Sequence, residues 1–238
     1  MIGSTPMLRV THIDTGPCEL FLKMEQLNPG NSIKDRIAMS MIKAAEEAGE
    51  LRPGGHIIEA TAGNTGISLA LVGALRGYRT TVVVPDKMSD GKISHLRAMG
   101  ATVVLTRSDV GKGHPEYYQD VAERLAREDT TAVYVNQFSN PANPIAHESG
   151  TGPEIWSQMN GDLDAIVAGI GSAGTMTGLG RYFKSLNPEI ELVLADPEGS
   201  ILTDLINEGV HSEPGTWLVE GIGEDFVPDI AELDHIDR

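Results

Sequence analysis

Short apolar runs rich in valine and isoleucine alternate along the chain with stretches of helical periodicity. The apolar runs predict strands at 19–24, 56–60, 80–84, 102–106, 132–135, 165–169 and 191–195. The periodic stretches predict helices at 33–48, 65–76, 92–99, 116–127, 144–158 and 175–185. Several apolar runs lack polar alternation, as strands covered on both faces do. The alternation therefore predicts βαβ units, mostly parallel sheets and an α/β fold.

Turn residues mark the ends of these elements. Gly49, Gly77 and Gly100 directly follow predicted helices and suit left-handed caps. The sequence NQFSNPANP at 136–144 reads as a loop and marks a candidate subdomain border. Ligands of open α/β sheets bind beyond the carboxyl ends of the strands, so the loops that follow strands are the candidate sites of chemistry.

The first such loop, NPGNSIKDR at 28–36, leads into a predicted helix. Asn31 or Ser32 can cap that helix, and Asp35 suits its first turn. Lys34 is unexpected there, because a cation is disfavoured at the positive end of a helix. An exposed lysine accounts for its position. Alternatively, a depressed pKa would let Lys34 act as an amine nucleophile or base.

Two further loops suit anion binding. Residues 61–66 join a strand to a helix start, where unpaired backbone N–H groups can hold a carboxylate or phosphate. Residues 169–174 read GIGSAG and match GxGxxG, and Asp196 follows the next strand, as in dinucleotide-binding folds. Ser172 and Thr175 add hydroxyl donors, which suits a terminal phosphate monoester better than a pyrophosphate. The fourth loop, 136–144, could line a cleft with Gln137 or form a capped turn.

Amino-acid composition and charge argue against several classes of ligand and binding partner. The 238 residues carry a formal net charge of −16, which argues against nucleic acid and anionic membranes as ligands. No apolar run is long enough for a membrane span, and the histidines show no metal-ligand spacing. The single cysteine, Cys18, excludes an intramolecular disulfide and fits a cytoplasmic location. Its apolar surroundings predict a buried core residue.

Four ordered motifs, NSIKDR, TAGNTG, NQFSNPANP and GIGSAGTMTG, resemble the cysteine synthase and cystathionine β-synthase family of pyridoxal-phosphate enzymes of fold type II. The resemblance covers nearly the whole chain, from GSTPML to VEGIGEDFVP. It implies two three-layer α/β subdomains with mostly parallel sheets. Residues 1–40 and 141–238 would form the larger, cofactor-phosphate subdomain, and 41–140 the smaller, substrate-loop subdomain.

The resemblance also implies the roles of individual residues. Lys34 would hold the cofactor as a Schiff base, and Asn64 would hydrogen-bond the pyridoxal 3′-oxygen. The residues implied to grip the substrate carboxylate are Thr61, Ala62, Gly63, Asn64 and Thr65, with Gln137 on the same side. The residues implied to cradle the cofactor phosphate are Gly171, Ser172, Ala173, Gly174 and Thr175.

The implied reaction is β-replacement on L-serine or O-acetyl-L-serine, in cysteine biosynthesis or transsulfuration. Lys34 would take the α-proton, the β-substituent would leave, and a thiol or sulfide would add. ADPEGSIL and VEGIGEDFVP look nearer to bacterial cystathionine β-synthases, whereas NQFSNPANP and SGTGPEIW look nearer to cysteine synthases. Glu224 departs from the tyrosine that many cystathionine synthases have. The donor and the acceptor stay open, and the resemblance implies a homodimer.

Two departures from the family pattern affect these expectations. The family commonly has serine where this chain has Ala62, so one hydroxyl donor is missing from the carboxylate grip. The family core also continues into a segment whose serine pairs with the pyridine nitrogen, and this sequence lacks that segment. A non-catalytic truncated homologue is therefore one alternative. An NAD(P)- or flavin-dependent oxidoreductase that uses 169–174 is the other.

Overall fold

A computed structural model describes residues 1–61 and 63–238, which divide into two compact units. The terminal unit comprises Met1–Arg36 and Pro144–Arg238, and the central unit comprises Ile37–Asn143. Helix α1 (Lys34–Glu47) begins in the terminal unit and continues in the central unit. Each unit has its own sheets and is described by itself below.

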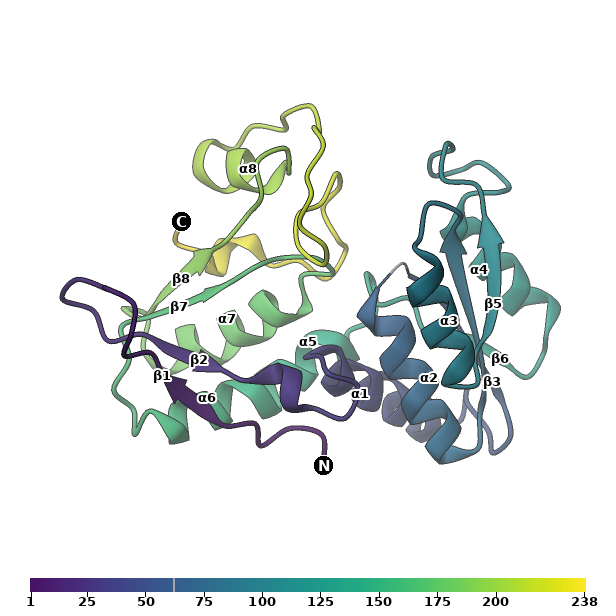
Figure 1. Ribbon diagram of the computed structural model, residues 1–238, viewed down its shortest axis with the longest axis horizontal. Helices are drawn as coiled ribbons and strands as arrows, with labels where there is room; N and C mark the ends of the chain where they lie inside the picture. Colours follow the sequence, from purple (N-terminus) through teal and green to yellow (C-terminus); the bar gives the residue numbers. More distant parts are fainter. Residues whose placement is uncertain (62) are drawn as a thin grey trace. The chain divides into compact units, whose positions relative to one another are not determined.

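The central unit is built on a four-stranded parallel sheet of order β5-β4-β3-β6 (Figure 1). Its strands are β3 (His56–Ala60), β4 (Arg79–Pro85), β5 (Thr102–Thr106) and β6 (Ala132–Tyr134). Its connecting helices are α2 (Asn64–Arg76), α3 (Asp90–Ala98) and α4 (Tyr118–Glu128). Gly77 ends α2 in a left-handed conformation with φ 78°, as the sequence predicts.

Helices cover both faces of this sheet. Val82 and Val84 of β4 pack in a cluster with residues of α2 and α3, whereas Val83 packs with residues of α4. Successive side chains of a strand point to opposite faces, which is why Val82, Val83 and Val84 are apolar without alternation. The apolar runs of β3 and β4 are interrupted by buried polar residues, Glu59 in β3 and Thr80 and Thr81 in β4.

The strand order reverses direction at β3. The chain proceeds from β3 outward through β4 to β5, and then returns to place β6 on the other side of β3. In open α/β sheets such a switch point opens a crevice at the carboxyl ends of the two strands. The segments that follow β3 and β6 are residues 61–63, before α2, and residues 135–141, before α5.

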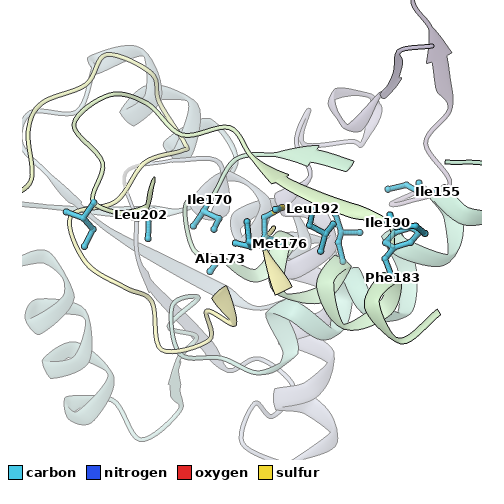
Figure 2. Close-up of a cluster of buried hydrophobic side chains, with 11 residues drawn as sticks. Ile155, Ile170, Ala173, Met176, Phe183, Ile190, Leu192 and Leu202 are labelled. Atoms are coloured by element: carbon cyan, nitrogen blue, oxygen red, sulfur yellow. The ribbon is translucent and has the colours of Figure 1, made fainter. Parts of the chain in front are cut away.

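The terminal unit contains two small sheets. β1 (Met7–Arg9) pairs antiparallel with β2 (Phe21–Lys23), and β7 (Ala165–Ala168) pairs parallel with β8 (Glu191–Leu194). The helical elements of this unit and of the border between the units are η1 (Glu25–Leu27), α5 (Ala142–Ala146), η2 (His147–Thr151), α6 (Gly152–Gln158), α7 (Gly174–Leu186), α8 (Leu202–Glu208) and η3 (Leu233–His235). Figure 2 shows the buried core of this unit, in which Met176 and Phe183 of α7 line up with Ile190 and Leu192.

The structure confirms the α/β class and its mostly parallel sheets, with local corrections. The predicted helix at 144–158 is a helical run that contains one π turn, His147–Thr151. β7 alternates between exposed and partly buried positions, and Val167 is 64% exposed, so β7 is not covered on both faces. Cys18 is exposed, and the expectation of a core cysteine is wrong. The sequence patterns missed β1 and α8, which are only three and seven residues long.

A buried ion cluster joins distant segments of the terminal unit. The Arg36 guanidinium donates to both Glu25 carboxylate oxygens at 2.7 and 2.8 Å, and to both Glu154 oxygens at 2.8 and 2.7 Å. Lys23 Nζ donates to Glu154 at 2.9 Å. Burial opposes ionisation of Glu154, but hydrogen bonds from Arg36, the Ser4 N–H and Lys23 lower its pKa to about 2. The cluster fixes the first turn of α1 against η1 and α6.

Arg36→Met is expected to destabilise the protein by about 3–5 kcal/mol, because it leaves two partly buried carboxylates without their partner. Arg9→Met is the matched control, since Arg9 pairs with Glu19 at the exposed surface and such pairs contribute about 0–1 kcal/mol. Urea unfolding measures both. The Glu154 contribution is present above pH 4.5 and is lost as the pH falls towards 2, so acid should destabilise the wild type more than Arg36→Met. Equal unfolding free energies for Arg36→Met and Arg9→Met would contradict the anchoring role.

Candidate active site

Lys34 is the first residue of α1, and its neighbours fix that first turn. The Ser32 hydroxyl accepts a hydrogen bond from the Lys34 N–H at 3.2 Å. The Asp35 carboxylate, which is fully buried, accepts from the Gly30 N–H at 2.6 Å. Asn31 adopts a left-handed conformation with φ 58°, which turns the chain into the helix. These contacts position Lys34 more firmly than one helix cap would.

The surroundings of Lys34 favour its neutral amine. Burial lowers the pKa of Lys34, and the Glu224 carboxyl opposes this with an attractive charge. Glu224 in turn has a pKa raised to about 8 by burial and by Asp225, against the opposing effect of Lys34. From the sequence, we expected the positive end of the helix to disfavour the Lys34 charge. In the structure, the main cause of its lowered pKa is removal of the amine from water. The arrangement suits an amine that must lose its proton to react.

The segment 169–174 connects β7 to α7, as the sequence predicts. Ala173 is the N-cap of α7, has φ 68° and provides no side-chain capping bond. Ser172, Ala173 and Gly174 are buried at this helix start. Alanine cannot cap a helix, so the backbone N–H groups of the first turn remain donors for an anion.

Close backbone packing explains two glycines of this segment. A Cβ atom on Gly171 would lie 2.7 Å from the carbonyl oxygen of Gly221, and one on Gly169 would lie 2.2 Å from a methyl carbon of Ile222. Contacts this short require the neighbouring chain to move. The segment at 221–222 therefore holds the β7–α7 connection in place, and larger residues would displace it.

A buried histidine supports the start of α7. His147 Nδ1 lies 2.9 Å from Thr151 Oγ1, and its Nε2 lies 3.3 Å from Thr175 Oγ1. Burial, followed by the charges of Lys34 and Arg36, lowers the pKa of His147 to about 3. His147 is therefore neutral at ordinary pH and orients the Thr175 hydroxyl. The π turn places His147 in this position, which the sequence pattern did not reveal.

The loop after β3 forms the second helix start of the predicted kind. Gly63 is the N-cap of α2 without a side-chain capping bond, and its N–H donates to Thr61 Oγ1 at 3.2 Å. Asn64 is exposed at the first position of α2, while Thr61 and Thr65 are 6% and 2% exposed. Ala62 lies outside the described residues. The Gly66 N–H donates to the Gly63 carbonyl oxygen at 3.2 Å, so the N–H groups of Asn64 and Thr65 are the candidate donors for an anion.

Gln137 joins this loop from the neighbouring strand. It follows β6, and its Oε1 accepts a hydrogen bond from the Thr65 hydroxyl at 2.7 Å. Its backbone oxygen accepts from Asn143 Nδ2 at 2.7 Å. The bond between Thr65 and Gln137 spans the switch point between β3 and β6, where the fold predicts a ligand crevice.

The predicted site residues form two groups. Those in the terminal unit are Lys34 and Gly171–Thr175, and those in the central unit are Thr61, Gly63, Asn64, Thr65 and Gln137. Sequence reasoning missed His147 and Glu59, which is a fully buried acid on β3. A glutamate inside an otherwise apolar strand was the available signal for Glu59, but the histidine had none.

The described part of the chain contains no group of three or more side chains arranged to hold a metal ion.

Asp196, the acid proposed for a dinucleotide ribose, accepts hydrogen bonds from the Thr203 N–H and hydroxyl at 3.1 and 2.9 Å. None of the helices in the described ranges combines the length and apolarity that crossing a bilayer requires.

Comparison with known proteins decides the family. The profile described as "Pyridoxal-phosphate dependent enzyme" matches residues 1–238. The chain belongs to this family. Nothing in these comparisons favours the dinucleotide alternative.

Curated relatives and a solved structure agree. Cystathionine β-synthase of Apis mellifera is 45% identical over 240 residues, which cover 100% of this chain and 47% of that protein. Cysteine synthase 1 of Neurospora crassa is 42% identical over 238 residues, covering 98% of this chain and 63% of that protein. A crystal structure of O-ureido-L-serine synthase matches with a TM-score of 0.89 at 35% identity, covering 99% of this chain and 72% of the other.

The residues in the terminal unit fit pyridoxal phosphate. A lysine with a lowered pKa suits attachment of an aldehyde, and an uncapped helix start suits a phosphate. Thr175, oriented by neutral His147, supplies a hydroxyl beside that helix start. The cofactor expectation is therefore met by chemistry as well as by family.

Gly171→Ala is expected to weaken binding of pyridoxal phosphate, because its Cβ would push the cradle away from Gly221. Overpacking of this kind costs about 1–3 kcal/mol, or roughly 5- to 150-fold in the dissociation constant. Gly111→Ala is the control, since a Cβ there meets nothing within 4 Å. Absorbance titration of the apoprotein with the cofactor measures both. Wild-type affinity in Gly171→Ala would contradict the cradle assignment.

Proposed function

We propose that this protein catalyses β-replacement on L-serine or O-acetyl-L-serine with a thiol or sulfide acceptor. The observation that carries the proposal is Lys34, a lysine of lowered pKa fixed at the start of α1 in a chain of the pyridoxal-phosphate family. The chain spans about half the length of the cystathionine β-synthases it matches, so the activity is inferred from the site and not transferred whole.

Lys34 is the residue that holds the cofactor and moves the α-proton. Pyridoxal phosphate, when bound, delocalises the charge left when a proton leaves the carbon next to the substrate nitrogen. Lys34 must be neutral to accept that proton, and burial of its amine favours this form. Glu224 limits the effect, since its charge favours the ammonium form.

Each of the two helix starts would bind one anion, the cofactor phosphate or the substrate carboxylate. In the terminal unit, Gly171–Thr175 at the start of α7 would hold the cofactor phosphate. In the central unit, Thr61–Thr65 at the start of α2 would bind the substrate carboxylate, with Gln137 beside it and Asn64 on the cofactor ring. Backbone N–H groups supply most of the positive potential, which is why a chain of net charge −16 can bind two anions.

Cystathionine β-synthases and cysteine synthases both match at 40–45% identity. This supports β-replacement as the class of reaction and does not distinguish L-serine from O-acetyl-L-serine as the donor. We favour the cystathionine type, on the resemblance of 195–202 and 219–228. A homodimer and a cytoplasmic location are part of the proposal. The dimer rests on the family resemblance, and the location rests on the single cysteine.

Borohydride reduction of the holoprotein, followed by peptide mapping, is expected to place the cofactor label on Lys34. Lys34→Ala should bind no reducible cofactor and lose at least about 100-fold in turnover, the scale of a general base. Lys43→Ala is the matched control, because Lys43 lies on the same helix, exposed and paired with Glu47. A label on another lysine, with normal cofactor loading, would overturn the proposal.

A further inference from the structure

Glu59 is an acid that the proposed reaction does not use. It lies on the central strand β3, has no exposed surface, and its Oε2 atom has no hydrogen-bond partner among the described residues. The parallel register pairs Glu59 with Val82, whose side chain faces α2. Its neighbours Ile58 and Ala60 face α4 instead. The carboxyl group therefore lies on the face of the sheet that α2 covers.

The Glu59 carboxyl contacts the chain that follows β6. Glu59 Oε1 accepts a hydrogen bond from the Gln137 N–H at 3.5 Å. The Gln137 carbonyl is held by Asn143, and its side chain is held by Thr65. Three contacts thus fix Gln137, and Glu59 provides the one at its amide nitrogen. Asn136, directly before Gln137, has a left-handed φ of 49°, a conformation that residues other than glycine seldom adopt.

We propose that Glu59 is a positioning residue, which sets the Gln137–Thr65 pair for binding of the substrate carboxylate. Because the Thr65 hydroxyl occupies Gln137 Oε1, the Gln137 side chain would offer its amide nitrogen to the carboxylate. The proposal rests on the proposed function for the identity of the ligand. Glu59 acts through Gln137 and does not touch the substrate.

The carboxyl of Glu59 is uncharged at neutral pH. Burial raises its pKa to about 8, against the lowering effect of backbone N–H groups of Gln137, Asn136 and Ala60. The ionisable group that interacts electrostatically with it is Tyr134 on β6. The charged residues of β4 and α2, Arg79 and Arg76, pair with Asp129 and Glu46. No cation of the described residues is paired with Glu59.

Protonation of Glu59 predicts how stability depends on pH. A carboxyl whose pKa is higher in the folded state stabilises the fold below about pH 4.5, and this contribution is lost as the pH rises to about 8. The ratio of the folding constants of wild type and Glu59→Gln should fall by up to about tenfold per pH unit in this range. A ratio that does not change with pH would contradict the claim that Glu59 is protonated in the folded protein at neutral pH.

Two substitutions separate positioning from mere stability. Glu59→Gln keeps an oxygen for the Gln137 N–H, whereas Glu59→Leu removes it. We expect Glu59→Leu to raise the KM of the holoenzyme for the amino acid by about 2- to 13-fold, the scale of one lost hydrogen bond between uncharged groups, with little change in kcat. Glu59→Gln should restore KM to near the wild-type value. Ile58→Val, on the same strand but the other face, is the control that weakens packing only.

Calorimetry with L-serine and with O-acetyl-L-serine gives a readout besides activity. Wild-type affinity in Glu59→Leu would overturn the proposal, and so would an equal loss of affinity in Ile58→Val. If Glu59→Leu fails to fold, Thr65→Val breaks the pair from its other end and should raise KM in the same way, and an unchanged KM would contradict the role of the pair. If the wild-type holoprotein binds neither amino acid, the proposed function fails and the substrate part of this proposal fails with it. The pH dependence of unfolding still decides the state of Glu59.

Discussion

The position of Lys34 depends on the ion cluster around Arg36, two residues further along α1. One buried guanidinium contacts two carboxylates that lie 11 and 118 residues away in the sequence. The Asp35 carboxylate holds Gly30 on the other side of the same turn. Removing charges from water is unfavourable, so such a cluster is weak evidence for stability as such. Its consequence is geometric, because the turn that carries the reactive amine has little freedom to move.

Both anion-type sites of this chain follow one local rule. At α2 and α7 the N-cap residue is Gly63 or Ala173, neither of which can provide a capping oxygen. No side chain of the N-cap residue therefore occupies the N–H groups at the helix start, and the helix dipole adds a partial positive charge there. Under the proposed function, this is how an acidic protein would bind a phosphate and a carboxylate without a cluster of arginines. Hydroxyl side chains lie beside each helix start. Thr175 contacts His147, and Thr65 donates to Gln137.

The sequence alone was sufficient for the α/β class and for the loops that carry the site, because apolar runs and helix punctuation are local signals. It could not supply the strand order, so the bond between Thr65 and Gln137 across the switch point was not predictable from spacing. The burial of Glu59 and the π turn that carries His147 depend on tertiary packing. Tertiary packing also decides the exposure of Cys18. Its apolar neighbours in the sequence suggested a buried residue, but Cys18 is exposed in the structure.

The central claim is that Lys34 removes the α-proton of the amino-acid substrate. Proton NMR of L-serine and of O-acetyl-L-serine, incubated separately with holoprotein in deuterium oxide without a thiol or sulfide, tests it most directly. The account predicts that the α-proton signal of at least one donor disappears by exchange or turnover with wild-type protein and persists with Lys34→Ala. An α-proton signal that persists for both donors with fully loaded wild-type protein would contradict the account.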